Sequence, residues 1–220
     1  MTEQEWTTST NSAQLLAWLE TPFGIGLRDR HRTTMLFGLA CALRALSQED
    51  SAVVWMLQKI EDSAYGIPDT EPHITLAHRA YIERHSVAPL LLATLDERSR
   101  HAPFDIANAA ALLAVRRLRL SSQQAMAGAD REQRAVQAAI LRDIHNPFRP
   151  VSFLPAWRTD TAVALARQMY DWQQFGAMPI LADALQDAGC ENEHVFNHCR
   201  DLNQVHVRGC WVLDAVLQKS

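Results

Sequence analysis

The sequence lacks the glycine-rich loops on which nucleotide-binding folds depend. Its eight glycines are scattered along 220 residues, and neither phosphate-loop nor dinucleotide-binding spacing occurs. The chain also has no G-x-S-x-G elbow and no H-E-x-x-H pair, so these hydrolase motifs are missing. His194 and His198 have the i, i+4 spacing of a zincin, but no glutamate lies between them to act as base for a metal-bound water. These absences favour a protein that is not an enzyme.

Long apolar runs and a regular cysteine framework are absent too. No apolar run approaches the ~18 residues that a membrane span needs, and the opening MTEQEWTTST is polar rather than a charged-then-apolar leader. The four cysteines have no regular spacing, which argues against a disulfide framework. We therefore expect a reduced, cytoplasmic protein with no membrane partner.

A strong charge of one sign is also missing. The net charge of −4 argues against a general nucleic-acid binder. Arg116, Arg117 and Arg119 lie close together and could meet phosphate, although such a run more often forms a solvated face near a helix C-terminus. A nucleic-acid accessory role is therefore the weakest of the functions that the sequence allows.

What the sequence does contain is helical periodicity. At 48% hydrophobic residues, the chain is long enough to bury a sizeable core, and no stretch shows sustained strand alternation. We predict an all-α fold, either a multi-helix bundle or an irregular array in which antiparallel helix pairs stack like a solenoid. The helices expected from spacing, caps and breakers cover residues 12–20, 29–46, 51–65, 73–85, 87–95, 105–120, 121–144, 161–175, 179–188 and 207–217.

These helices are predicted to form one domain over residues 1–220. Residues 1–120 supply the N-terminal helices, 121–160 a long helix and a proline-rich connector, and 161–220 a C-terminal helical arm. The connector is too rich in proline for a helix and too apolar to extend into water. We expect its aromatic residues to pin it across the helices.

The C-terminal arm concentrates the residues that could bind a metal. Three of the four cysteines and three of the nine histidines lie between Met178 and Leu217. Two pairs, His194 with His198 and His206 with Cys210, have the i, i+4 spacing that places two ligands on one helix face. A helical hairpin here could form a closed three-thiolate, one-imidazole site, which suits structural zinc. The predicted ligands are Cys190, Cys199, His206 and Cys210, with His198 as an alternate.

Simpler explanations exist for the same residues. Cys199 shares an apolar helix face with Val195, and Cys210 is next to Trp211, so both thiols could be small core residues. The close C-x2-4-C pair of most zinc motifs is absent. A cysteine nucleophile, Cys199 or Cys210 with His198 or His206 as base, is another possibility.

Several motifs carry a family resemblance. The segments HNPFRPV, PILADALQDAGC, FNHCR and HVRGCWVLD, with MTEQEW, LLAWL and LFGLAC near the start, resemble a family of uncharacterised bacterial proteins. The resemblance covers about residues 1–45 and 138–218. It matches Cys190, His198, Cys199, His206 and Cys210 to the family pattern, and it implies no particular activity.

From these observations the sequence predicts a non-enzymatic helical module. It would bind another protein or act as an accessory, with the C-terminal arm as its rigid part and a structural zinc ion as stabiliser. The alternative is a small metal- or cysteine-dependent enzyme sited at His198, Cys199, His206 and Cys210.

Overall fold

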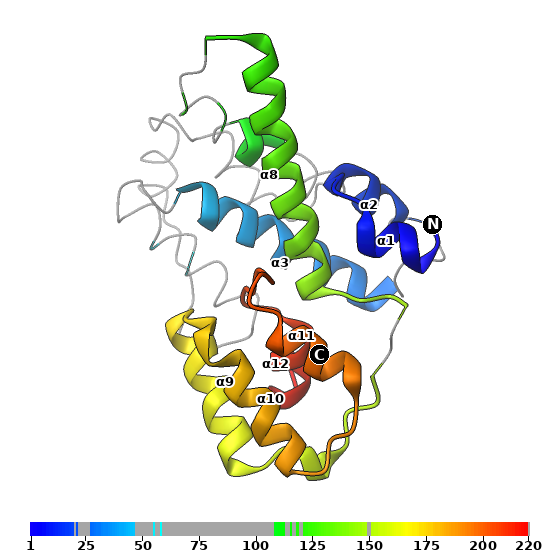
Figure 1. The fold of residues 1–220 in the computed structure, drawn as a ribbon, viewed down its shortest axis with the longest axis vertical. Coiled ribbons are helices and arrows are strands. Elements are labelled where there is room, and N and C mark those ends of the chain that lie inside the picture. The colour runs from blue at the N-terminus through cyan, green and yellow to red at the C-terminus, as the bar shows by residue number, and fades with distance from the viewer. Residues whose placement is uncertain are drawn as a thin grey trace. The chain divides into compact units, whose positions relative to one another are not determined.

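The computed structural model describes residues 1–19, 21, 27–46, 55, 58, 108–112, 115, 118, 121–148 and 151–219. Within these ranges the regular elements are helices and no strand occurs, which confirms the predicted all-α class (Figure 1). None of the helices in the described part of the chain is long and apolar enough to cross a membrane. The helices predicted at 51–65, 73–85 and 87–95 lie outside the described residues, except for Trp55 and Gln58, and so do the three arginines of the 116–119 run.

The chain divides into two compact units, Met1–Leu141 and Arg142–Ser220. The boundary falls inside helix α8 (Gln123–Ile144), whose last three residues belong to the second unit. It also falls within the stretch 121–160 that the sequence assigns to a long helix and a connector.

The first unit begins with a short helix that periodicity did not predict, α1 (Glu3–Thr8). The Thr2 side chain accepts a hydrogen bond from the Glu5 backbone N–H, and the Glu5 carboxylate accepts one from the Thr2 backbone N–H. This reciprocal capping box satisfies two amide groups at the helix start, and its T-x-x-E signature is present in the sequence. Trp6 is buried, with its ring centroid 5.6 Å from that of Trp18.

Apolar helix faces form the core of the first unit. Helix α2 (Ser12–Leu19) buries its three leucines, and α3 (Leu27–Leu46) buries Leu36, Phe37 and Leu39. A buried hydrogen bond of 2.9 Å from the Ser12 hydroxyl to the Gln137 side-chain oxygen joins α2 to α8. Both helices follow their predicted bounds within two residues, and leucines of the stripes that marked them, such as Leu16 and Leu39, are buried.

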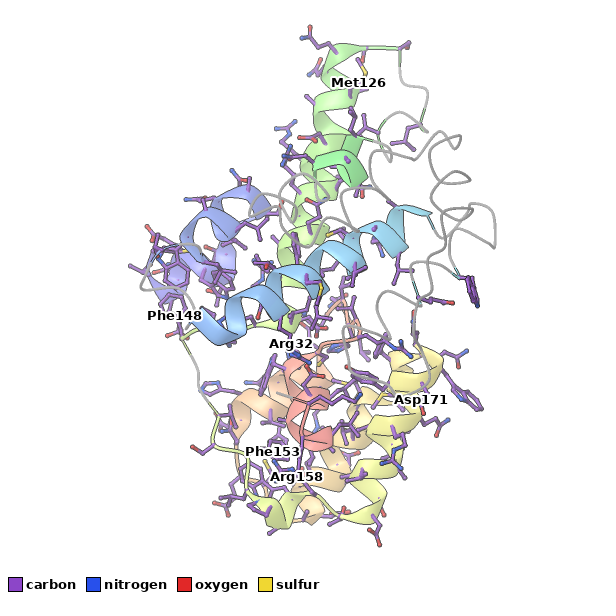
Figure 2. The ribbon with its side chains drawn as sticks, turned by 180° about the vertical axis from the view of Figure 1, so that it is seen from behind. Arg32, Met126, Phe148, Phe153, Arg158 and Asp171 are labelled. Atoms are coloured by element: carbon purple, nitrogen blue, oxygen red, sulfur yellow. The ribbon has the colours of Figure 1, made fainter. Side chains whose placement is uncertain are left out.

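The first turn of α8, unlike these buried helix faces, is exposed to solvent. Met126 is 41% exposed and lies in this outlying turn (Figure 2). The residues of α8 that precede Gly128 are exposed, and apolar burial begins only at Ala129. The polar sequence at the start of this helix therefore remains in water.

The second unit consists of shorter helices. In chain order these are η1 (Pro155–Trp157), α9 (Asp160–Trp172), η2 (Phe175–Ala177), α10 (Met178–Asp187), α11 (Glu193–Arg200) and α12 (Trp211–Leu217). Helix α10 packs against α9 and α11, and α12 packs against α9. Pro179 lies in the first turn of α10, and Gly189 follows the C-terminal end of this helix with φ +83°. Both residues are at the positions that the sequence predicts.

In the connector before α9, two aromatic residues contact each other, and an arginine makes the contact with a helix. The Phe153 and Trp157 rings meet edge-on with centroids 5.1 Å apart, and the Arg158 guanidinium lies 5.4 Å from the Phe153 centroid (Figure 2). Arg158 Nε also donates to the Ala215 carbonyl at 3.1 Å. The end of the connector is thereby tied to α12.

The last helix differs from its prediction. It begins at Trp211 rather than at Val207, because the preceding residues form a turn. Gly209 has φ +90°, a left-handed conformation that a helix cannot contain, and the Cys210 N–H donates to the Val207 carbonyl at 3.1 Å. His206 and Cys210 are therefore brought together by a turn and not by a helix face.

Candidate metal centre

Helix α11 carries the first residue of the site, His198. The Asn192 side chain caps this helix by accepting hydrogen bonds from the backbone N–H groups of His194 and Val195, at 2.9 and 3.3 Å. Val195 and Cys199 are buried on its inner face. The His198 side chain is 11% exposed and His194 is exposed, so the two histidines that the zincin-like spacing paired have different surroundings.

The segment after α11 supplies two more residues, His206 and Cys210. The His206 side chain is 7% exposed, and Cys210 is fully buried at the start of α12. Arg208, between them, is buried; its Nε donates to the Tyr170 carbonyl on α9 at 2.7 Å, and its guanidinium lies 5.5 Å from the Tyr170 ring centroid. Arg208 thus anchors the turn that aims both side chains inward.

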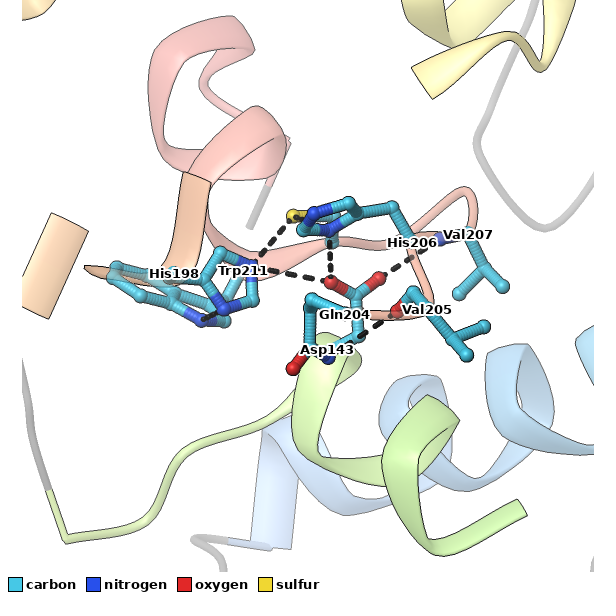
Figure 3. A network of polar contacts seen from close by, with 8 residues as sticks. Asp143, His198, Gln204, Val205, His206, Val207 and Trp211 are labelled. Atoms are coloured by element: carbon cyan, nitrogen blue, oxygen red, sulfur yellow. Dashed lines mark hydrogen bonds and ion pairs between the residues drawn. The ribbon is translucent and has the colours of Figure 1, made fainter. Parts of the chain in front are cut away.

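The fourth residue, Asp143, comes from the end of α8. Its side chain is completely buried. One carboxylate oxygen, Oδ2, accepts a hydrogen bond of 2.8 Å from the Val207 backbone N–H. That bond orients the carboxylate so that Oδ1 faces the two histidines (Figure 3).

Four potential ligand atoms converge at this place: Asp143 Oδ1, His198 Nε2, His206 Nδ1 and Cys210 Sγ, here called the Asp-His-His-Cys cluster. All four lie within 4.8 Å of one another. The carboxylate oxygen is 2.8 Å from the His206 nitrogen and 3.1 Å from the His198 nitrogen. The sulfur is 3.2 Å from the His198 nitrogen and 4.0 Å from the His206 nitrogen. This buried group could hold a metal ion.

The spacing fits tetrahedral coordination. Zinc bonds of roughly 2.0–2.3 Å imply that neighbouring ligand atoms of a tetrahedron are roughly 3.2–3.8 Å apart. The four separations above range from 2.8 to 4.0 Å and bracket that interval. All six separations stay within 4.8 Å.

The same distances do not fit a nucleophile-base-carboxylate relay. In such a relay the nucleophile contacts one ring nitrogen of the histidine and the carboxylate contacts the other. In this cluster the two groups meet the same nitrogen, Nε2 of His198, and likewise both lie near Nδ1 of His206. Side-chain atoms that converge on one point have the arrangement of metal ligands and not that of a catalytic relay.

Burial and charge set the protonation of the cluster. Burial by itself raises the pKa of Asp143, but its hydrogen bonds with His198 and His206 are the main opposing cause, and the net effect lowers that pKa. Burial raises the pKa of the Cys210 thiol, and the Asp143 carboxylate raises it further. Cys210 therefore resembles a protonated, inert thiol unless a cation is present to stabilise its thiolate.

A divalent ion would stabilise the thiolate form of Cys210 beside the Asp143 carboxylate. One carboxylate, one thiolate and two neutral imidazoles carry a total charge of −2, which a divalent cation cancels. A neutral assembly is far less costly to bury than its separate charged parts. The donor set of the cluster thus fits zinc in both charge and chemistry.

The structure brings together part of the ligand set predicted from the sequence. The cluster includes His206, Cys210 and the alternate ligand His198, but not Cys190 or Cys199. Those two cysteines are buried at 1% exposure, and burial raises the pKa of the Cys199 thiol to about 12. Both therefore lie in surroundings that suit packing residues.

Asp143 was missed by sequence reasoning, although a signal was present. It lies three residues after Ile140 and just before Ile144, on the apolar stripe of α8. An acidic residue at a position that the helix buries needs a cationic or hydrogen-bonding partner. A polar residue on an apolar helix stripe is therefore a candidate ligand.

The chain matches no protein-family model, and no significant match was found among curated proteins or solved structures. The resemblance to a bacterial family stays a prediction, so function has to be argued from the site itself.

Proposed function

We propose that the C-terminal unit, Arg142–Ser220, is a helical protein-interaction module whose fold is stabilised by a structural zinc ion in the Asp-His-His-Cys cluster. The observation that carries the zinc proposal is the convergence of four ligand atoms of suitable type within 4.8 Å. Four protein ligands complete a tetrahedral site and leave no position for substrate, which favours a structural role over the enzyme alternative.

The ion would join three parts of the unit that are distant in sequence. Asp143 ends α8, His198 lies on α11, and the remaining two ligands flank the turn before α12. Helices α11 and α12 have only eight and seven residues, too few for independent stability in water. A shared ion supplies the missing cross-link, as structural zinc does in other small domains.

Metal content with matched cysteine variants tests the zinc proposal. The purified full chain should contain one zinc per molecule, and Cys210→Ala and Asp143→Asn should lose it. Cys199→Ala is the control, because this cysteine is equally buried but lies outside the cluster. Zinc lost from Cys199→Ala and kept in Asp143→Asn would instead favour the ligand set predicted from the sequence.

Cobalt substitution checks the geometry of the ligands. Co²⁺ in place of zinc should give the strong visible absorption of a tetrahedral ion and a sulfur-to-cobalt charge-transfer band. The Cys210→Ser variant should lose that band. Weak absorption typical of five or six ligands would indicate added water and would support the enzyme alternative.

The interaction role is supported by large apolar side chains that the second unit exposes. Trp172 on α9 is 66% exposed and Ile180 on α10 is 58% exposed, and these two helices pack together. Tryptophan is enriched among the residues that supply most of the binding energy in protein interfaces. A photo-crosslinking phenylalanine analogue in place of Trp172 should capture a defined protein in cells. The same analogue at Arg167, an exposed polar position on α9, is the control; equal capture at both positions would contradict the proposal.

A further inference from the structure

Trp211, the first residue of α12, makes a contact that bears on how the cluster could bind a metal. Its indole Nε1 lies 3.3 Å from His198 Nδ1, and the two rings are 4.9 Å apart at an angle of 50° (Figure 3). The indole nitrogen can only donate a hydrogen bond. In this contact His198 Nδ1 is therefore the acceptor and carries no proton.

The proton of a neutral His198 must then be on its other nitrogen. A neutral imidazole has one N–H group and one acceptor nitrogen. With Nδ1 accepting from Trp211, the proton lies on Nε2, which faces Asp143 Oδ1 at 3.1 Å and Cys210 Sγ at 3.2 Å. In this tautomer His198 donates a hydrogen bond into the cluster and has no lone pair there for a cation.

Metal binding requires the opposite tautomer. A cation at the centre of the cluster needs the Nε2 lone pair, which leaves the proton on Nδ1. Ligand histidines usually donate this second N–H to a carboxylate, a carbonyl or water. Here it would point at the N–H of Trp211, and two donors cannot share a hydrogen bond.

From this conflict we propose that Trp211 holds His198 in the metal-free tautomer and that zinc binding breaks the Trp211–His198 hydrogen bond. The indole then moves away from His198 Nδ1, which takes a new acceptor. This proposal rests on the proposed zinc function and adds a coupling between the loaded state of the cluster and the start of α12. It predicts that Trp211 opposes zinc binding, although it touches a ligand.

The decisive variant is Trp211→Phe. Phenylalanine keeps an aromatic ring against His198 but removes the N–H, so it destabilises only the metal-free arrangement. Zinc affinity should rise about two- to tenfold, which corresponds to the net contribution of one hydrogen bond. Competition with a chromophoric chelator at fixed pH measures the dissociation constants. Trp172→Phe, an exposed tryptophan of the same unit, should leave the affinity unchanged.

Nitrogen NMR of the full chain provides a second measurement. The indole N–H signal that is missing from Trp211→Phe identifies Trp211 in the unmodified protein, and zinc should shift it. The ring nitrogens of His198 should report a proton on Nε2 without metal and on Nδ1 with zinc. A metal-free His198 protonated on Nδ1 would overturn the proposal.

The outcomes separate the two proposals. If the unmodified chain binds no zinc, the proposed function fails. If it binds zinc and Trp211→Phe, folded as judged by its thermal melt, binds equally or more weakly, only the role of Trp211 fails. In that case Trp211 would be a packing support for His198.

Discussion

The two units of this chain reach the same fold class by different physical means. In the first unit, α3 and α8 have 20 and 22 residues and carry apolar stripes, and α2 buries three leucines. In the second unit, α10, α11 and α12 have ten, eight and seven residues, and the segment before α12 is held by polar contacts of Val207 with Asp143 and of Arg208 with Tyr170. Long helices can be held by the apolar area that they bury, whereas short helices need additional cross-links.

The buried polar groups of the two units also differ in charge. The buried Ser12–Gln137 hydrogen bond in the first unit joins two neutral side chains, so it introduces no charge. In the second unit Asp143 places a carboxylate in a fully buried position beside two histidines and a thiol. A buried charge of this kind costs stability unless its partners are complete. Under the proposed function, the second unit depends on the ion that its cluster would hold, and the first unit does not.

Removal of zinc should have the largest effect, and it should be confined to the second unit. With free zinc roughly 1,000-fold above its dissociation constant, bound zinc stabilises a folded unit by about 4 kcal/mol. A chelator should therefore speed hydrogen exchange in α11 and α12 and leave α2 protected. Asp143→Asn should show no further response to chelator. Equal loss of protection in both units would end the distinction between them.

Truncation of a core leucine should have the next largest effect, in the first unit. Leu16 is 2% exposed, and Leu16→Ala should reduce the free energy of unfolding by about 3 kcal/mol because it removes buried methyl groups and leaves a cavity. Denaturant unfolding measures the loss, and zinc content should stay unchanged. Leu202→Ala is the control, since Leu202 is 87% exposed and its truncation should cost less than about 0.5 kcal/mol. Zinc lost from Leu16→Ala would show that the units are not independent.

A change in the turn before α12 should have the smallest effect on stability but a specific effect on the cluster. Gly209 has φ +90°, and Gly209→Ala should cost about 1–2 kcal/mol because an L side chain is strained in that conformation. Zinc affinity should fall with it, since the turn places Cys210. Gly176→Ala is the matched control, because an added Cβ there meets nothing within 4 Å. Unchanged zinc affinity in Gly209→Ala would contradict the role given to the turn.

The predicted metal ligands show how much of a coordination site the sequence alone reveals. The i, i+4 spacing predicted that His206 and Cys210 lie close together. The structure places them together through a turn at Gly209 and not through a helix. The same reasoning favoured Cys190 and Cys199 because thiolates are typical zinc ligands. Both cysteines are buried outside the cluster, which ligand type alone does not reveal.

The sequence by itself determined α2, α3, α8, α9 and α10 to within a few residues, because apolar periodicity, Pro179 and Gly189 act over one or two turns. The tertiary structure alone decided that Asp143 meets His206, 63 residues further along the chain. It also decided which nitrogen of each histidine faces the cluster, since that depends on neighbours such as Trp211. Local order follows from interactions between near residues, whereas a coordination site depends on packing among distant ones.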